Sequence, residues 1–283
     1  MTNNNQVPIV SVIVPCHNYG QFIHEALQSV SAQTFSQWEC IVVDNDSTDN
    51  TSEIVAQIQK NDKRFKYMFQ KNKGVSSARN TGIKQSSGKY ILPLDADDKI
   101  GKTYLEKAIG ILEENKKIKI VYCKAEYFGD ITAAWNLPEY DIHNMLIESH
   151  IFCSGLYKRT DYELTGGYSE EMEVGFEDWD FWLTLLSAGG EVYQIPEVLF
   201  YYRIRSSSRN NLIAANKDQQ RVLRQIIYQR HKDLYTKYLS IPDLIQDYIN
   251  IRNEMAYIKA QKRISLPERL KCHLKRIKEL ILK

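Results

Sequence analysis

The most informative part of the chain is Tyr90-Ile91-Leu92-Pro93-Leu94-Asp95-Ala96-Asp97-Asp98. Its first five residues have the pattern of a short buried strand, and its last four hold three carboxylates. Neighbouring carboxylates repel one another and raise one another's pKa. A divalent cation removes that repulsion, and hard oxygen ligands suit Mg²⁺ or Mn²⁺. Because Mg²⁺ commonly bridges carboxylates to substrate phosphates, the stretch predicts a metal–diphosphate site at the end of a strand.

The residues before this stretch alternate between strand and helix patterns. Apolar runs predict strands over 9–14, 40–43 and 65–69. Apolar residues at helical spacing predict helices around 22–30 and 54–58, and a turn and helix span 74–83. This βαβαβαβ order is typical of a parallel sheet with helices on both faces.

The pattern after residue 98 is less regular. Residues 125–150 show no clear period, and from about residue 211 onward the chain reads as helical and charged. The elements predicted between residues 99 and 210 are helices over 104–114 and 177–188 and strands over 118–122, 152–157 and 191–202.

Composition excludes several classes of protein. The 283 residues carry a net charge of only +2, so the overall charge does not favour binding to nucleic acid. The five cysteines are widely spaced and form no CxxC pair, which argues against a zinc site and a disulfide framework. No stretch approaches the roughly twenty apolar residues of a membrane span, and residues 1–8 lack an apolar signal core. We therefore expect a cytoplasmic protein.

Polar clusters follow three of the four predicted strands, at 15–18, 44–47 and 95–98. In an open α/β sheet, ligands bind beyond the carboxyl ends of the strands, where these clusters would meet. Each cluster alone is more often a turn or a helix cap, but the three together favour a site. The absence of GxGxxG, GxxxxGK[ST] and GxSxG disfavours a dinucleotide-binding dehydrogenase, a P-loop NTPase and an α/β-hydrolase.

An ordered set of motifs carries a family resemblance. SVIVP at 11–15, IVVDNDSTD at 41–49, GVSSARNTG at 74–82, LDADD at 94–98, FEDWDFW at 176–182 and YR at 202–203 resemble a family 2 glycosyltransferase of the GT-A fold. The similarity covers roughly residues 8–209. It implies a Rossmann-like, mostly parallel central sheet flanked by helices, and an inverting transfer from a nucleotide-diphosphate sugar, usually a UDP-sugar. We therefore divide the chain into a catalytic domain, 1–210 (nucleotide-binding part 8–98, acceptor part 99–210), and a helical extension, 211–283.

The resemblance also implies which residues hold the donor base. Pro15, His17 and Asn18 are expected to line the uridine pocket. Asp44 is expected to accept a hydrogen bond from the uracil imide, with Asp46 nearby.

The same resemblance places the ribose and the diphosphate beside the acidic stretch. Asp95 is expected at the ribose and Ala96 beside it, while Asp97 binds Mn²⁺ or Mg²⁺ with Asp95 and Asp98 close by. Arg79 is expected to reach the nucleotide. The alternative for Arg79 is an ion pair with an aspartate at a strand end.

The adjacent acids Glu177 and Asp178 are the candidates for catalysis. Inversion needs a base within hydrogen-bond reach of the acceptor hydroxyl, on the face opposite the leaving diphosphate. The resemblance assigns Asp178 as this base and Glu177 as its neighbour or as the alternative base. Without this resemblance, the simpler interpretation of the pair is two acidic residues that stabilise a helix N-terminus.

Two arginines follow the last predicted strand. Arg203 and Arg205 are expected to clamp the donor phosphates. Many family members have a histidine where this chain has Arg205, so metal binding is expected to depend mainly on Asp97. The loop 206–209 is either a mobile lid or an ordinary exposed basic loop.

The expected acceptor is a glycan or a lipid-linked sugar in bacterial surface polysaccharide synthesis, by family analogy. Residues 251–283 hold ten Lys or Arg against three Asp or Glu, with leucines and isoleucines at helical spacing from 266 to 281. Such a helix can lie on the inner face of a membrane, pack on the catalytic domain, or join a second subunit in a homo-oligomer. Trp135, Tyr140 and Trp179 are candidates for stacking on an acceptor sugar, whereas Trp182 is expected in the core.

Two other functions compete with this one. A sugar nucleotidylyltransferase shares this style of sheet, but it should carry a glycine-rich loop and a lysine where this chain has His17-Asn18-Tyr19. A nucleotide-sugar-binding scaffold without turnover would not need both Asp97 and Asp178.

Overall fold

The computed structural model divides into two compact units, Met1–Arg230 and His231–Lys283. The helix α9 (Lys217–Arg230), which the sequence analysis assigned to the extension, belongs to the first unit. In the second unit, α10 (Lys232–Tyr238) is described. The predicted loop 206–209 and the basic helix around 266–281 lie outside the described residues, which are 7–172, 174–205, 216–239, 249–250 and 253.

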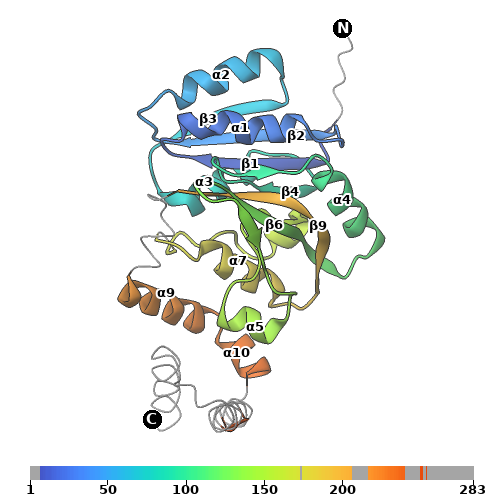
Figure 1. Cartoon of the computed structure of the whole chain (residues 1–283), viewed down its shortest axis with the longest axis vertical. Helices are drawn as coiled ribbons and strands as arrows, with labels where there is room; N and C mark the ends of the chain where they lie inside the picture. Colours follow the sequence, from blue (N-terminus) through green and yellow to red (C-terminus); the bar gives the residue numbers. More distant parts are fainter. Residues whose placement is uncertain (1–6, 173, 206–215, 240–248, 251–252, 254–283) are drawn as a thin grey trace. The chain divides into compact units, whose positions relative to one another are not determined.

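One nine-stranded sheet forms the centre of the first unit, in the order β3-β2-β1-β4-β8-β6-β9-β5, with β7 paired to β6. Figure 1 labels the strands β1 to β4, β6 and β9 of this sheet. The strands are β1 (Val10–Cys16), β2 (Trp38–Asn45), β3 (Phe65–Gln70), β4 (Tyr90–Pro93), β5 (Lys99–Ile100), β6 (Ile118–Gly129), β7 (Ala133–Trp135), β8 (Leu156–Lys158) and β9 (Glu191–Ile204). Besides α9, the helices of this unit are α1 (Gly20–Ser31), α2 (Thr51–Asn61), α3 (Gly74–Lys84), α4 (Tyr104–Glu114), α5 (Ile142–Ile147), α6 (Arg159–Glu163) and α7 (Glu177–Leu186).

The first four strands, β3-β2-β1-β4, are parallel, as predicted. Every residue of β1 and β2 is buried, which explains why both strands are mostly apolar. Right-handed crossovers place α1 and α2 on one face of these strands and α3 on the other. Gly82 lets α3 approach the sheet closely, because a Cβ there would lie 2.6 Å from Ile13 Cγ2 and 3.0 Å from Val43 Cγ2.

The second half of the sheet is mixed. The strand β8 is antiparallel to both β4 and β6, β9 is parallel to β6, and β5 is antiparallel to β9. The strand β6 runs to Gly129, beyond the predicted end at 122, and pairs there with β7 and β9. The segment without a period, 125–150, thus contains the end of β6, β7 and α5, which form through long-range pairing that local pattern does not reveal.

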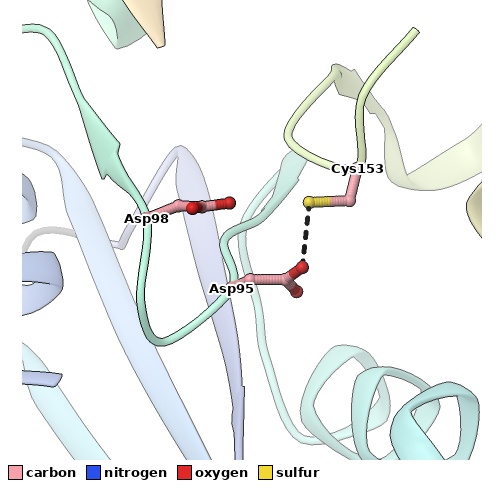
Figure 2. A group of neighbouring side chains, drawn as sticks. All are labelled: Asp95, Asp98 and Cys153. Atoms are coloured by element: carbon pink, nitrogen blue, oxygen red, sulfur yellow. Dashed lines mark hydrogen bonds between the residues drawn. The ribbon is translucent and has the colours of Figure 1, made fainter. Parts of the chain in front are cut away.

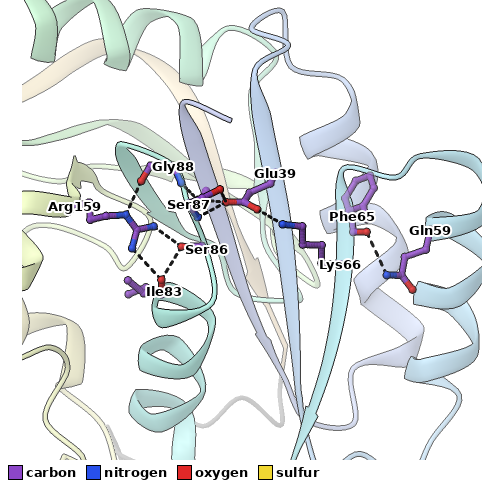
Figure 3. Close-up of polar contacts among 10 residues, drawn as sticks. Glu39, Gln59, Phe65, Lys66, Ile83, Ser86, Ser87, Gly88 and Arg159 are labelled. Carbon is purple, nitrogen blue, oxygen red and sulfur yellow. Dashed lines mark hydrogen bonds and ion pairs between the residues drawn. The ribbon is translucent and has the colours of Figure 1, made fainter. Parts of the chain in front are cut away.

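A polar network fixes the amino ends of the parallel strands (Figure 3). The buried Glu39 carboxylate accepts hydrogen bonds from Ser11 Oγ (2.8 Å), Ser87 N (2.6 Å) and Lys66 Nζ (2.6 Å). Beside it, Arg159 donates to Gly88 O at 2.7 Å. The polar groups at the amino ends of these strands are therefore hydrogen-bonded within the protein. The candidate ligand site lies at the opposite, carboxyl ends of the strands.

Candidate active site

A cavity of about 360 Å³ opens at the carboxyl ends of β1 and β4, and we call it the β1 cavity. Part of its wall comes from residues that the sequence analysis assigned to the donor. These residues are Pro15, His17, Asp95, Ala96, Asp97 and Arg205. His17 is held by Asn45 O, 2.8 Å from its Nδ1. Asn45, from the cluster after β2, lines the cavity as well, so residues from all three predicted polar clusters meet in one hollow.

The remaining residues of these clusters shape the loops behind the cavity. Asp44 is buried and accepts from Tyr67 Oη at 2.7 Å and from Ser47 N at 2.8 Å. Asn18 Oδ1 accepts from Thr48 N at 2.8 Å. Asn18 and Asp46 have positive φ values of 58° and 71°, which Asn and Asp tolerate in turns. Asn18, Asp44 and Asp46 are absent from the described lining, so their contact with a nucleotide stays a prediction.

Asp97 is held by an arginine inside the β1 cavity. Arg205 Nη2 donates to Asp97 Oδ2 at 2.8 Å and to Tyr19 Oη at 2.9 Å. Its guanidinium also lies 4.9 Å from the ring centres of Tyr19 and Phe22. Burial and the neighbouring Asp95 raise the pKa of Asp97 to about 6, although Arg205 acts in the opposite direction. Arg205 therefore fixes a positive charge where the sequence analysis expected the donor diphosphate.

Arg203, the other predicted phosphate clamp, faces a different set of groups. Its backbone N donates to Asp98 Oδ1 at 2.9 Å, and its Nε donates to Asp97 O at 2.9 Å. Its Nη2 lies 3.0 Å from Glu25 Oε1. Arg203 is outside the described lining of both cavities, so its role as a phosphate clamp also stays a prediction.

Asp95, Asp98 and Cys153 form a second group near the acidic turn, with ligand atoms within 4.8 Å of one another (Figure 2). Asp98 Oδ2 is buried and has no hydrogen-bond partner among the described residues. Cys153 donates to Asp95 Oδ2 at 3.4 Å, and burial raises the pKa of its thiol well above the usual value. The orphaned oxygen and the two carboxylates fit Mn²⁺ or Mg²⁺, whereas a protonated thiol suits neither ion.

Arg79 is fully buried and bridges two carboxylates. Its Nη2 lies 2.8 Å from Asp95 Oδ1, and its Nη1 lies 3.0 Å from Glu177 Oε1. This is the ion pair that the sequence analysis gave as the alternative to nucleotide contact. The bridge links the end of β4 to the start of α7 across 98 residues of sequence.

A second cavity of about 330 Å³ begins at the amino end of α7, and we call it the α7 cavity. Glu177 and Asp178 both line it, after Phe176, whose φ of 64° is unusual for an aromatic residue. Burial and the Glu177 charge raise the pKa of Asp178 to about 6, while Arg79 lowers it. Asp95 and Tyr202 line both cavities, so the two hollows adjoin at the end of β4.

Comparison of the sequence with known proteins identifies the family of this chain. The family model described as glycosyl transferase family 2 matches residues 11–178. The chain belongs to this family. It is 32% identical over 223 residues to TuaG of Bacillus subtilis (strain 168), a glycosyltransferase assigned to teichuronic acid biosynthesis, over 75% of this chain and 84% of TuaG. It is 27% identical over 189 residues to a hyaluronan synthase of Pasteurella multocida, over 65% of this chain and 19% of the synthase.

Two solved structures share the fold of this glycosyltransferase. The S. aureus TarS 1–349 complex with UDP-GlcNAc aligns with a TM-score of 0.63 at 22% identity, over 81% of this chain and 73% of that one. The mannosyltransferase PcManGT from Pyrobaculum calidifontis, in complex with GDP-Man and Mn²⁺, aligns with a TM-score of 0.61 at 20% identity, over 99% and 82%. These likenesses confirm the predicted GT-A fold.

Sequence reasoning missed several residues of the α7 cavity. Gln220 and Arg224 of α9 line it, as do Cys153 and Phe152 before β8. Residues on α9 show only a charged helical pattern, which carries no signal of a site. Of the predicted aromatic residues, Trp135 and Trp179 line the cavity, and Trp182 is buried in the core as expected. None of the described helices is both long and apolar enough to cross a membrane.

Proposed function

We propose that this glycosyltransferase moves a sugar from a UDP-sugar, with inversion, to a hydroxyl of a glycan or lipid-linked acceptor in bacterial surface polysaccharide synthesis. The observation that carries the proposal is the pair of adjoining cavities, which share Asp95 and Tyr202. One cavity holds Asp97 and Arg205, and the other holds Asp178. The UDP-GlcNAc complex of TarS and the names of TuaG and the hyaluronan synthase support the donor and the setting.

In this mechanism Asp178 is the base. Glu177 is tied to Arg79 at 3.0 Å, whereas no described Lys or Arg forms an ion pair with Asp178. A carboxyl with a pKa of about 6 is ionised at pH 7 and still basic enough to take the proton of the acceptor hydroxyl. The hydroxyl oxygen then attacks the anomeric carbon, the bond to the diphosphate breaks, and UDP leaves.

Two sources of positive charge would stabilise the departing diphosphate. Arg205 supplies a guanidinium that is already oriented by Tyr19 and Asp97. A divalent cation, Mn²⁺ or Mg²⁺, would be held by the carboxylates of Asp95, Asp97 and Asp98 and would supply Lewis-acid stabilisation of the leaving oxygens. The Mn²⁺ complex of PcManGT supports the choice of ion.

The setting of the reaction belongs to the same proposal. We propose transfer on the cytoplasmic side of the membrane, with the basic residues of 251–283 contacting anionic lipid. Packing of this tail against a second subunit is the competing arrangement, and vesicle co-sedimentation with and without residues 251–283 distinguishes the two.

A UDP-release screen over common UDP-sugars tests the proposal. We expect one donor to be hydrolysed slowly without acceptor, and EDTA to reduce its turnover at least tenfold, with recovery on adding Mn²⁺. Asp97→Ala should lose this release. Pyrophosphate as product would instead identify a nucleotidylyltransferase, and binding of UDP-sugars without release of UDP would identify a scaffold. Equal release in EDTA and in Mn²⁺ would remove the metal from the mechanism.

A further inference from the structure

One cation of the α7 cavity comes from outside the region that the family model matches. Arg224 lies on α9 and lines the cavity that also contains Asp178. The matched residues end at 178, so family membership assigns no role to this side chain. Its position in the lining of the proposed acceptor cavity makes it a candidate for contact with the acceptor.

Arg224 is held in place from three sides. Its Nη1 donates to Ile147 O at 2.5 Å. Its guanidinium carbon lies 5.7 Å from the ring centre of Phe176 and 5.3 Å from that of Trp179. Both rings also line the cavity. Arg224 is exposed to solvent, and these contacts orient its planar group before any ligand arrives, which lowers the entropy lost on binding.

The charge of Arg224 distinguishes it from nearby arginines. Arg79 is neutralised by Asp95 and Glu177, and Arg230 on the same helix lies 2.7 Å from Asp180 Oδ1. Arg224 forms no ion pair with a carboxylate in the described part of the chain. Among the described residues, its guanidinium donates to the backbone carbonyl of Ile147, which orients the group without cancelling its charge. An arginine of this kind suits a bidentate oxyanion from a ligand.

The other charges of the cavity restrict where an anion can sit. Asp95, Glu148, Glu177 and Asp178 also line the cavity, and of these Asp95 and Glu177 are paired with Arg79. Among the described lining residues, Arg224 is the cation that no carboxylate pairs, so an anionic group of a ligand is favoured beside it, while a neutral hydroxyl of the same ligand is favoured beside Asp178. This arrangement orients the acceptor as well as holding it.

We propose that Arg224 binds a carboxylate or phosphate on the acceptor, so that the enzyme selects an acidic sugar or a phosphorylated acceptor over a neutral one. This inference rests on the proposed function, because it takes the α7 cavity as the acceptor site. A uronic acid and a sugar phosphate present the same oxyanion chemistry, and the experiment separates them.

The test measures binding of three para-nitrophenyl probes to the full chain saturated with UDP: a glucuronide, a glucoside and a glucoside 6-phosphate. We expect the glucuronide or the phosphate to bind about 10- to 100-fold more tightly than the glucoside, the range of a charge-assisted contact. Arg224→Gln should remove that preference, and Arg224→Lys should keep part of it. The matched control is Arg221→Gln, which removes another exposed arginine of α9 and should keep the full preference for the acidic probes.

Two readings keep this inference separate from the proposed function. Arg221→Gln should keep the UDP release of the unchanged chain, and the thermal melting of Arg224→Gln should stay near that of Arg221→Gln. Equal binding of acidic and neutral probes, or equal losses in the two variants, would overturn the role of Arg224. Failure of every UDP-sugar to turn over, with probe selectivity intact, would overturn the proposed function and leave an anion site at Arg224. If UDP itself does not bind, the probes are compared without it and the same criteria apply.

Discussion

Replacing Asp178 by Asn should abolish sugar transfer and, at pH 8, stabilise the fold. A general base contributes about 10²- to 10⁴-fold to the rate, so kcat should fall by at least a hundredfold. The stability gain has a separate origin. Burial and the Glu177 charge raise the pKa of Asp178 to about 6, which means that the folded protein holds its ionised form at a cost.

The size of that gain follows from the pKa shift. A rise from 3.8 to about 6 corresponds to about 3 kcal/mol at a pH well above 6. Because the Asp178 side chain is half-buried and partly screened by water, we expect about 1 to 2 kcal/mol. The sign is fixed by linkage: a raised carboxyl pKa favours the folded state at low pH, and this advantage is lost as the pH rises through 6. The difference between Asn and Asp should therefore be largest at pH 8 and shrink towards pH 4.

Glu177→Gln is the matched control, because Glu177 is the neighbouring acid and the other candidate base. Its carboxylate is buried and paired with Arg79 at 3.0 Å. Removing its charge leaves Arg79 with Asp95 alone, and breaking a buried pair costs about 3 to 5 kcal/mol. The two substitutions should thus change stability in opposite directions.

Urea unfolding at pH 8.0 and 4.5 measures both effects, and UDP release in the presence of acceptor measures activity. A stability gain of Asp178→Asn that is the same at both pH values would refute the titration argument. Retained transfer in Asp178→Asn together with lost transfer in a folded Glu177→Gln would make Glu177 the base.

Three further predictions concern the surroundings of the site. The ratio kcat/KM should fall below about pH 6, where Asp178 and Asp97 both take up protons, and a profile flat down to pH 4.5 contradicts this. Arg205→Gln should weaken UDP binding about 10- to 100-fold by calorimetry, whereas unchanged affinity would show that Arg205 only neutralises Asp97. Glu39→Gln, at the opposite edge of the sheet, should destabilise the fold by about 1 to 3 kcal/mol in urea titration, because the amide leaves a buried donor without its acceptor, and it should leave kcat unchanged; a large loss of kcat would count against separate roles for the two edges.

The first half of the fold was predictable from the sequence because its signals are local. The strands β1, β2 and β4 are buried on both faces, so each appears as a mostly apolar run followed by polar residues. Parallel strands of this kind must place their carboxyl ends on one edge, and this rule brings the residues after β1 and β4 together.

The rest of the site depends on contacts between distant residues, which local patterns do not encode. Arg79 meets Glu177 across 98 positions, and Cys153 reaches Asp95 across 58. The segment 125–150 shows no period because β7 and α5 are short and partly exposed, so pairing with β6 rather than propensity defines the strand. The role of Arg224 could not be predicted from the sequence for the same reason, because it depends on the rings of Phe176 and Trp179 and on the Ile147 carbonyl.

Adjacent acids can take different roles only if something makes their surroundings unequal. Both Glu177 and Asp178 begin α7, where the helix dipole favours the ionised form of each. Arg79 bonds to Glu177 and fixes its negative charge next to Asp178, and that charge, together with burial, raises the pKa of Asp178. Arg79 also lowers that pKa, so it limits the rise that Glu177 and burial produce. A buried ion pair adds little net stability, and here its value is better explained as tuning a neighbouring base.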